Sequence, residues 1–212
     1  MAERCHFVSC HTSVSFGDLC AQNDNRDGKG DLAGRIFIRR LTVGGALAAI
    51  TCSTVNSYKG LVAKVPGFEG GVYTWAPTHV TYGPNNRSAM LRMPQNRFCI
   101  ENRATDMCMN AYLAMACTTA ATVEGLGQKT DPGPALGKDL YLMSEAEFDE
   151  TGVQRLPRTL EEATNLLEGD ELLKAAIGDQ MHNSFIQYKR DEWERYSVSI
   201  SQWEIEEYLR YF

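Results

Sequence analysis

Three arginines and one glutamate that lie close together in the sequence are the side chains best suited to chemistry. Arg87 and Arg92 stand in the segment NNRSAMLRMP, and Glu101 and Arg103 stand in RFCIENR. The planar guanidinium group of arginine binds phosphate or carboxylate through two parallel hydrogen bonds. These four residues therefore suggest an anion-binding site. Arginines at sheet edges are also commonly solvated or paired with surface acids, so the pattern alone leaves both interpretations open.

Two short strands are expected to carry these four residues, one in AMLRMP and one in RFCIENR. Side chains alternate along a strand, so Glu101 and Arg103 share one face, with their Cα atoms about 7 Å apart. Arg87 and Arg92 would point to opposite faces of one ideal strand. A bend between these two arginines is therefore needed before both can reach one site.

Helices are expected around the strands. The small apolar residues of VGGALAAI predict a helix within 32–52. The segment MCMNAYLAMACTTAATVEG predicts a second helix, capped by Thr105 or Asp106 and ended by a glycine near 125. This helix is almost uncharged, which is typical of a helix buried on all sides, so we expect it to be central.

The last seventy residues are predicted to be helical as well. Capping-box patterns in TLEE and SQWE mark two helix starts, and breaks are expected near Gly169 and Gly178.

Length and composition place the chain among globular proteins of one large or two small domains. The 212 residues are 43% hydrophobic and 23% charged, and the net charge of −6 argues against a general nucleic-acid binder but not against a small anionic ligand. No run of eighteen apolar residues is present, and the first residues lack the apolar core of a signal peptide. We expect a cytoplasmic protein that does not cross a membrane.

The seven cysteines are an odd number and form no CxxC pair, so reduced thiols are expected rather than a disulfide framework. A zinc site built from Cys5, His6, Cys10 and His11 is an alternative, but the spacing of these residues matches no standard zinc site.

Several long motifs resemble those of the glutamine synthetase family. TVNSYK, NNRSAMLRMP and IENRATDMCMNAYLAMA are similar to three consecutive family motifs and stand in the same order. The segments TWAPTHVTYGPNNR, LPRTLEEA and YKRDEWERY, and the terminal SQWEIEEYLRYF, are most similar to the branch that contains glutamate–methylamine ligases.

This resemblance implies an α+β fold: a glutamine synthetase catalytic domain with an antiparallel sheet packed with helices and a helical C-terminal region. The N-terminal β-grasp domain of the family has no counterpart in the sequence. Residues 1–212 would then be the C-terminal part of a catalytic domain, with the sheet and active-site loops in 1–104 and the helical region in 105–212.

The resemblance also implies an ATP-dependent ligase that joins glutamate to ammonia or a small amine through a γ-glutamyl phosphate. ATP and Mg²⁺, or Mn²⁺, would be its cofactors. The implied partners are further copies of the chain or a complementary N-terminal half, with neither nucleic acid nor membrane involved.

Four site residues follow from the resemblance to the central motifs. Glu101 would bind the metal near the nucleotide phosphates. Arg103 would contact the transferred phosphate and the glutamate, Arg87 would be shared by phosphate and substrate, and Arg92 would be a second nucleotide contact.

Other positions follow the family less closely. His11 and Ser13 match its nucleotide-contacting pair, whereas Ser9 replaces a metal-binding histidine and puts that metal site in question. Gly60 stands where the family has an arginine that holds the substrate α-carboxylate. Glu69 would be the glutamate of a flap that takes a proton from the amine.

A chain without the N-terminal part would lack most of the carboxylates that hold the metals. The alternative function is therefore an inactive fragment, or an oligomerisation or regulatory module, of such an enzyme. A catalytic sheet without its partner half should also show an apolar patch and unpaired strand edges, which promote association.

Overall fold

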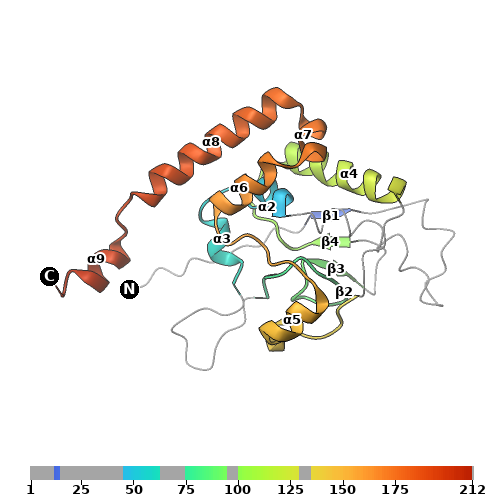
Figure 1. Cartoon of the computed structure of the whole chain (residues 1–212), viewed down its shortest axis with the longest axis horizontal. Helices are drawn as coiled ribbons and strands as arrows, with labels where there is room; N and C mark the ends of the chain where they lie inside the picture. Colours follow the sequence, from blue (N-terminus) through green and yellow to red (C-terminus); the bar gives the residue numbers. More distant parts are fainter. Residues whose placement is uncertain (1–11, 15–44, 63–74, 95–99, 129–134, 212) are drawn as a thin grey trace.

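A small sheet with a group of helices above it and one helix below it makes up the described part of the chain (Figure 1). The computed structural model describes residues 12–14, 45–62, 75–94, 100–128 and 135–211. The fold class expected from the sequence is confirmed by this arrangement and by the structural neighbours reported below.

The sheet has four strands in the order β1-β4-β3-β2. They are β1 (Thr12–Val14), β2 (Tyr82–Pro84), β3 (Leu91–Met93) and β4 (Ile100–Asn102). Both predicted strands around the arginines are therefore present, and β4 lies antiparallel to both β1 and β3.

The pairing of β2 with β3 is parallel, which corrects the expectation of a wholly antiparallel sheet. Parallel neighbours usually need a long crossover connection. Here Asn85 adopts a left-handed backbone conformation with φ of 51°, and only residues 85–90 connect the two strands. The backbone N–H of Leu91 donates to the carbonyl of Thr81 at 3.0 Å, which brings β3 alongside β2.

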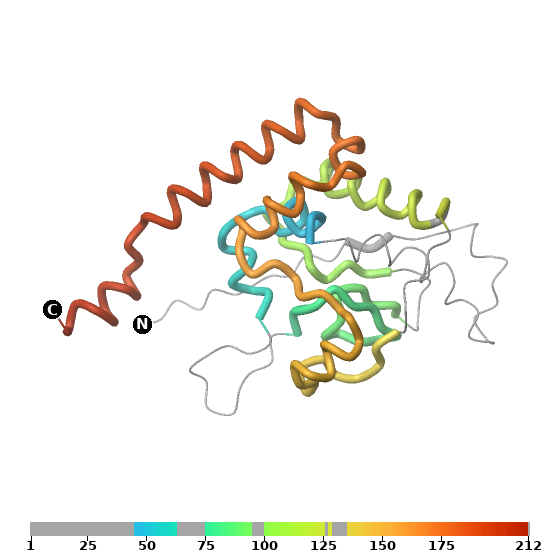
Figure 2. The backbone as a smooth tube through the Cα atoms, in the orientation of Figure 1, coloured from blue at the N-terminus to red at the C-terminus, as the bar shows by residue number. Residues whose placement is uncertain are grey.

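The helices differ in where they lie relative to the sheet, and the tube in Figure 2 traces them along the chain. Above the sheet in Figure 1 lie α2 (Gly45–Thr51), α4 (Ala111–Gln128), α6 (Leu160–Glu168) and α7 (Glu171–Ile177), and α5 (Glu145–Thr151) lies below it. The remaining helices are α3 (Ser57–Gly60), the short 3-10 helix η3 (Leu140–Leu142), α8 (Asp179–Ser197) and α9 (Gln202–Tyr208).

The main core cluster contains residues of α2, α4, α6 and β3. Helix α2 is buried along its whole length and packs against α6 and α4. Gly45 lies close to α6, where an added Cβ would meet the end of the Leu166 side chain. The largest fully buried apolar side chains are Leu47, Ile50, Met90, Leu91, Leu140, Leu160 and Leu167.

Helix α4 differs from its prediction in three ways. Asn110 caps it, because its Oδ1 accepts from the backbone N–H groups of Tyr112 and Leu113. The helix continues past Gly125 to Gln128. One of its faces is exposed, so the expectation of a helix buried on all sides was wrong for this structure.

The helical C-terminal region is as expected, with breaks after Glu168 and Ile177. The predicted capping box at Ser201 is complete. At Thr159 only half of the box forms, because the Glu162 carboxylate accepts from the backbone of Arg158 instead.

The end of the chain extends away from the rest of the molecule, and α9 lies well apart from the sheet (Figure 1). We call residues 196–211 the C-terminal arm. Its exposed large apolar side chains are Tyr196, Val198, Ile200, Trp203, Ile205, Tyr208, Leu209 and Tyr211. None of the helices in the described ranges is long and apolar enough to span a membrane.

Candidate active site at the β3–β4 ladder

A buried ion pair between two opposed residues of β3 and β4 forms the centre of the candidate site. Arg92 and Glu101 are register partners in the antiparallel ladder. The Nη1 of Arg92 donates to Oε2 of Glu101 at 2.9 Å, and the glutamate side chain is only 3% exposed. Cross-strand neighbours have Cβ atoms about 5 Å apart, so the ladder itself brings the two charges together.

Arg103 extends the same ladder beyond the end of β4, since its backbone N–H donates to the carbonyl of Met90 at 2.8 Å. Its Nε donates to the carbonyl of Arg87 at 2.9 Å, and its Nη2 donates to the carbonyl of Trp75 at 2.8 Å. Arg103 therefore joins two loops that are distant in the sequence.

The electrostatic surroundings of Arg103 show that the predicted cluster lies in one region. Burial is the main cause that lowers the pKa of Arg103 below its ordinary value. Glu101 opposes this effect, whereas the positive charges of Arg92 and Arg87 add to the lowering. Three guanidinium groups thus share a region with one carboxylate, and such an excess of positive charge suits an anion.

Arg87 lies in the bend that precedes β3, and it is exposed. This bend is the one that the spacing of Arg87 and Arg92 required. The side chain of Asn86 fixes it: Nδ2 donates to the carbonyls of Leu136 and Lys138 at 2.9 and 2.8 Å, and Oδ1 accepts from Ser88.

A second support comes from the aromatic pair of Trp75 and Tyr141. The two ring centroids are 6.3 Å apart, and the Tyr141 hydroxyl donates to the carbonyl of Ala76 at 2.6 Å. Trp75 has a positive φ of 57°, an unusual conformation for a non-glycine residue that surrounding contacts must maintain.

Sequence reasoning did not identify Trp75, Asn86 or Tyr141 as positioning residues. The Asn85-Asn86 pair carries a turn signal that could have indicated the bend. Nothing local marks Tyr141, because its partner Ala76 is far away in the chain.

The other predicted site residues are only partly placed. Ser13 pairs with Glu101 in the β1–β4 register, and its contact with the nucleotide stays a prediction. His11, Glu69 and Ser9 lie outside the described residues, as do the four residues of the alternative zinc site. Gly60 is the last residue of α3.

The described residues do not by themselves fit a divalent metal. Among them there is no group of three or more histidine, cysteine, aspartate or glutamate side chains that could hold an ion. Glu101 is one carboxylate, and it already accepts from Arg92. A Mg²⁺ site usually needs further oxygen ligands, so the described residues can supply at most one carboxylate ligand of such a site.

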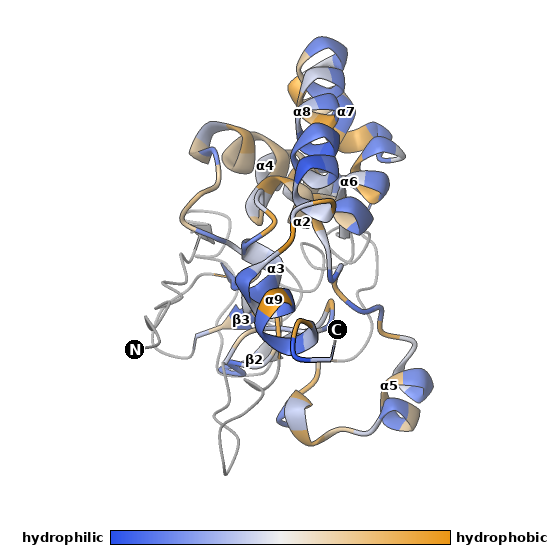
Figure 3. Cartoon of the chain, turned by 90° about the vertical axis from the view of Figure 1, so that its left-hand side faces the viewer, coloured by the Kyte–Doolittle hydropathy of each residue, from blue (hydrophilic) through white to orange (hydrophobic). Residues whose placement is uncertain are grey.

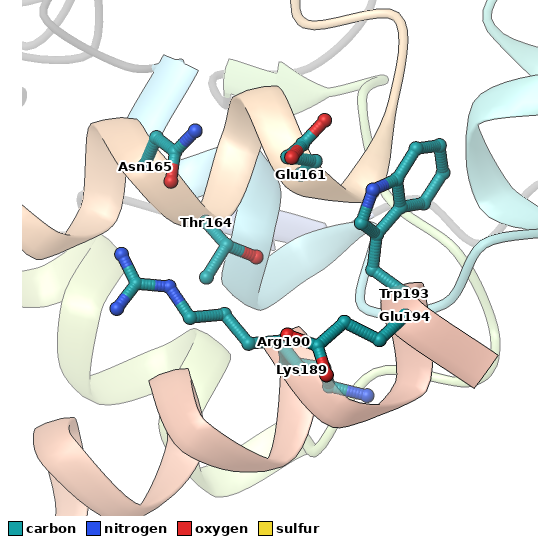
Figure 4. Close-up of a pocket in the computed structure, with 7 residues that line it drawn as sticks. All are labelled: Glu161, Thr164, Asn165, Lys189, Arg190, Trp193 and Glu194. Carbon is teal, nitrogen blue, oxygen red and sulfur yellow. The ribbon is translucent and has the colours of Figure 1, made fainter. Parts of the chain in front are cut away.

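A separate hollow of about 130 Å³ lies between α6 and α8 (Figure 4). Its basic residues are already paired. Lys189 contacts Glu192 at 2.8 Å, and Arg190 contacts Glu168 at 2.6 Å. The first contact lies within α8, whereas the second joins α8 to α6. The residues that line the hollow include none of the arginine cluster.

Comparisons with known proteins agree with this fold. A sequence model of the family described as "Glutamine synthetase, catalytic domain" matches residues 9–208. The chain is 42% identical over 167 residues to the glutamate–methylamine ligase of Methyloversatilis universalis, a match that covers 79% of this chain and 36% of that protein. It is 39% identical over 172 residues to the glutamine synthetase of Archaeoglobus fulgidus, covering 79% of this chain and 33% of that protein.

Solved structures give the same result. A structure described as a GmaS/ADP complex superposes with a TM-score of 0.78 at 32% identity, covering 95% of this chain and 46% of that one. The apo form of GmaS without ligand has a TM-score of 0.75. The chain therefore spans between a third and a half of the length of these relatives and matches their C-terminal catalytic part. On these grounds the chain belongs to the glutamine synthetase family, whose named members are ligases that form carbon–nitrogen bonds.

Proposed function

We propose that this chain provides the arginine-bearing face of an ATP-dependent ligase that joins the γ-carboxylate of glutamate to ammonia or a small amine. The observation that carries the proposal is the grouping of Arg87, Arg92, Glu101 and Arg103 around the β3–β4 ladder in a member of the glutamine synthetase family. The similarity to a glutamate–methylamine ligase favours a small alkylamine as the nucleophile.

The reaction has two steps. A γ-carboxylate oxygen of glutamate attacks the γ-phosphorus of ATP, so ADP leaves and γ-glutamyl phosphate forms. The amine nitrogen then attacks the acyl carbon, the C–O bond to phosphate breaks, and the nitrogen loses a proton. Negative charge is crowded at the transferred phosphoryl group in both steps, and fixed guanidinium groups stabilise it.

The three arginines support this chemistry in different ways. Arg92 balances the charge of the buried Glu101. Arg103 is held by the carbonyls of Arg87 and Trp75, so its position is fixed before any ligand binds. Arg87 is exposed and stands in a rigid bend, and we assign it the contact with the transferred phosphate.

We also propose the roles that the family resemblance implies for the remaining site residues. His11 and Ser13 would contact the nucleotide, Glu69 would accept the amine proton, and Glu101 would provide one ligand to Mg²⁺ or Mn²⁺. The other metal ligands would come from the N-terminal part of the fold, and the enzyme would work in the cytoplasm.

Replacement of the exposed arginine tests the proposal. Phosphate release that depends on both glutamate and methylamine, or ammonia, should fall by about 100-fold in Arg87→Ala. The melting temperature should stay unchanged, because the side chain of Arg87 is exposed. Arg158→Ala is the matched control, since it removes another exposed arginine outside the sheet. Full turnover in Arg87→Ala would show that the phosphate contact is assigned to the wrong residue.

A second candidate is a non-catalytic module of such an enzyme. It is favoured by the single carboxylate that the described residues bring to the site. The assay should therefore be run with the chain alone and with the N-terminal part of a relative added. Turnover only in the mixture would indicate a complementary half, whereas its absence in both would favour the module.

Further copies of the chain are the other proposed partners. The C-terminal arm presents a series of exposed aromatic and aliphatic side chains away from the rest of the molecule. Exposed apolar surface of this extent is typical of protein–protein contacts, so we propose a homo-oligomer in which the arm contacts a neighbour.

A further inference from the structure

The hollow between α6 and α8 lies on a polar surface and is bordered by two helices. Residues three or four apart share one face of a helix, so each helix presents one set of side chains to the hollow. Figure 3 shows α8 mostly in the colour of hydrophilic residues, so a ligand of this hollow must satisfy polar groups. The lining residues are Glu161, Thr164 and Asn165 on α6, and Lys189, Arg190, Trp193 and Glu194 on α8 (Figure 4).

The two basic side chains at the hollow already have partners. Lys189 pairs with Glu192, and Arg190 pairs with Glu168. Lys189 is also buried, so opening its ion pair would be costly. An anion would have to displace one of these two carboxylates, and the hollow is therefore not suited to an anionic ligand.

The two acidic side chains at the hollow have no such partners. In the part of the chain that the structure describes, the carboxylates of Glu161 and Glu194 accept no hydrogen bond and form no ion pair. The side-chain amide of Asn165 likewise has no hydrogen-bond partner among the described residues. Two negative charges and an amide oxygen are therefore available to accept hydrogen bonds from a cation.

The indole of Trp193 distinguishes this hollow from a simple group of acidic residues. The ring is half-buried and packs against the main core cluster, and its centroid lies 5.7 Å from that of the Tyr196 ring. Figure 4 shows the indole nitrogen on the side of α6. An indole face attracts organic cations and gives an alkyl chain an apolar contact. A hard ion such as Mg²⁺ keeps a shell of water and oxygen ligands instead, and gains nothing from such a face.

We propose that the hollow binds the ammonium group of a small primary alkylamine. The N–H groups of the ligand donate to the carboxylates of Glu161 and Glu194, and its alkyl chain lies against the indole of Trp193. A primary alkylamine is protonated at neutral pH, like the side chain of lysine. A quaternary ammonium has no N–H group to donate and would leave the carboxylates without hydrogen bonds.

The size of the hollow limits the ligand to a short chain. Its volume is about 130 Å³. A protein cavity of about 150 Å³ accepts benzene, so an ammonium group with roughly four carbons fits the hollow. The inference uses neither the family membership nor the proposed function, because the lining residues include none of the arginine cluster.

Titration of the full chain with n-butylammonium chloride at constant ionic strength tests the site. The chain has three tryptophans, so a nitrogen–proton NMR spectrum contains three indole signals, and Trp193→Phe identifies one of them. The Trp193 signal should shift saturably, with a Kd of about 1 mM or lower. The signal of Trp203 in the exposed C-terminal arm should stay unchanged.

Two control ligands separate the parts of the proposal. n-Butanol has the same carbon chain without a charge, and tetramethylammonium has the charge without an N–H group. Each should bind more weakly than n-butylammonium by about tenfold or more. Equal binding of either control, or no shift with n-butylammonium, would overturn the proposal. A Trp193 signal that shifts with protein concentration and not with the amine would also overturn it, because another copy of the chain would then occupy the hollow.

Two substitutions test the carboxylates. Glu161→Gln and Glu194→Gln each keep the shape of the side chain and remove one charge, so each should weaken binding by about fivefold. Glu150→Gln is the matched control, because it removes the charge of another exposed glutamate on α5, on the other side of the sheet. This control should bind n-butylammonium like the wild type, and circular dichroism should show equal helical content in all three variants. Wild-type affinity in both Glu161→Gln and Glu194→Gln would overturn the proposal.

Discussion

Removal of Arg92 should destabilise the fold far more than removal of an exposed arginine whose ion pair has the same N–O distance. In the Arg92→Met variant the Glu101 carboxylate, which is 3% exposed, loses its ion pair with the Arg92 guanidinium. Breaking a buried pair by removing one partner costs about 3–5 kcal/mol. The Arg92 side chain is itself 17% exposed, so we expect a value near the lower limit, about 3 kcal/mol.

The ion pair of Arg195 with Asp191 in α8 is a matched control. Its N–O distance is also 2.9 Å, but the two side chains are 66% and 62% exposed. Water screens such a pair, and helix pairs of this spacing contribute about 0.3–0.5 kcal/mol. Arg195→Met should therefore lower the free energy of unfolding by no more than that amount.

Urea unfolding followed by circular dichroism at neutral pH measures both effects. The double variant Arg92→Met/Glu101→Leu should be more stable than Arg92→Met alone, because it no longer buries a carboxylate that has lost its ion pair with Arg92. If Arg92→Met proves as mild as Arg195→Met, then Glu101 is solvated in solution. The description of a buried charge pair at the centre of the site would then be wrong.

Three further predictions concern other parts of the fold. The free energy of unfolding should fall as the pH drops below about 6.5, because burial lowers the pKa of His79 and only the unfolded state then takes up the proton. In His79→Phe the midpoint of urea unfolding should therefore change less between about pH 5 and 7 than it does in the wild type. Gly83→Ala should lower the free energy of unfolding by about 1–3 kcal/mol in thermal melts, since an added Cβ would overlap the carbonyl oxygen of Leu136; an unchanged melt would contradict this contact. Hydrogen bonds from the side chain of Ser201, and then from its backbone, lower the pKa of Glu204. In a carboxyl NMR titration, Ser201→Ala should therefore raise the pKa of Glu204 toward 4.5. The same pKa in both proteins would mean that the capping box does not form.

The candidate site combines rigid and accessible parts. The side chains of Asn86 and Arg103 donate hydrogen bonds to backbone carbonyls, and these bonds fix the loops before a ligand binds. Arg87 remains exposed at the edge of this framework. Such preorganisation is what charge stabilisation in phosphoryl transfer requires, since groups that are already in place need not reorganise during the reaction.

The sequence by itself determined the features that depend on neighbours in the chain. Alternation along a strand predicted that Glu101 and Arg103 share a face, and the strands β3 and β4 form where expected. Glycines ended α6 and α7 as predicted, because a glycine after a helix interrupts its hydrogen-bond series at little steric cost. The ordered motifs were sufficient to predict the family, which the comparisons confirm.

Tertiary structure alone decided which distant groups meet. The contact of Arg103 with Trp75 and that of Tyr141 with Ala76 join segments that carry no local signal for one another. The Asn85-Asn86 turn signal marks the bend between β2 and β3 but not the parallel pairing of the two strands. The same holds for α4, whose uncharged sequence predicted burial on all sides, whereas the structure leaves one of its faces exposed. The spacing of apolar residues indicates which side of a helix or strand is buried. The segment that packs on that side lies elsewhere in the chain and is not indicated by the spacing.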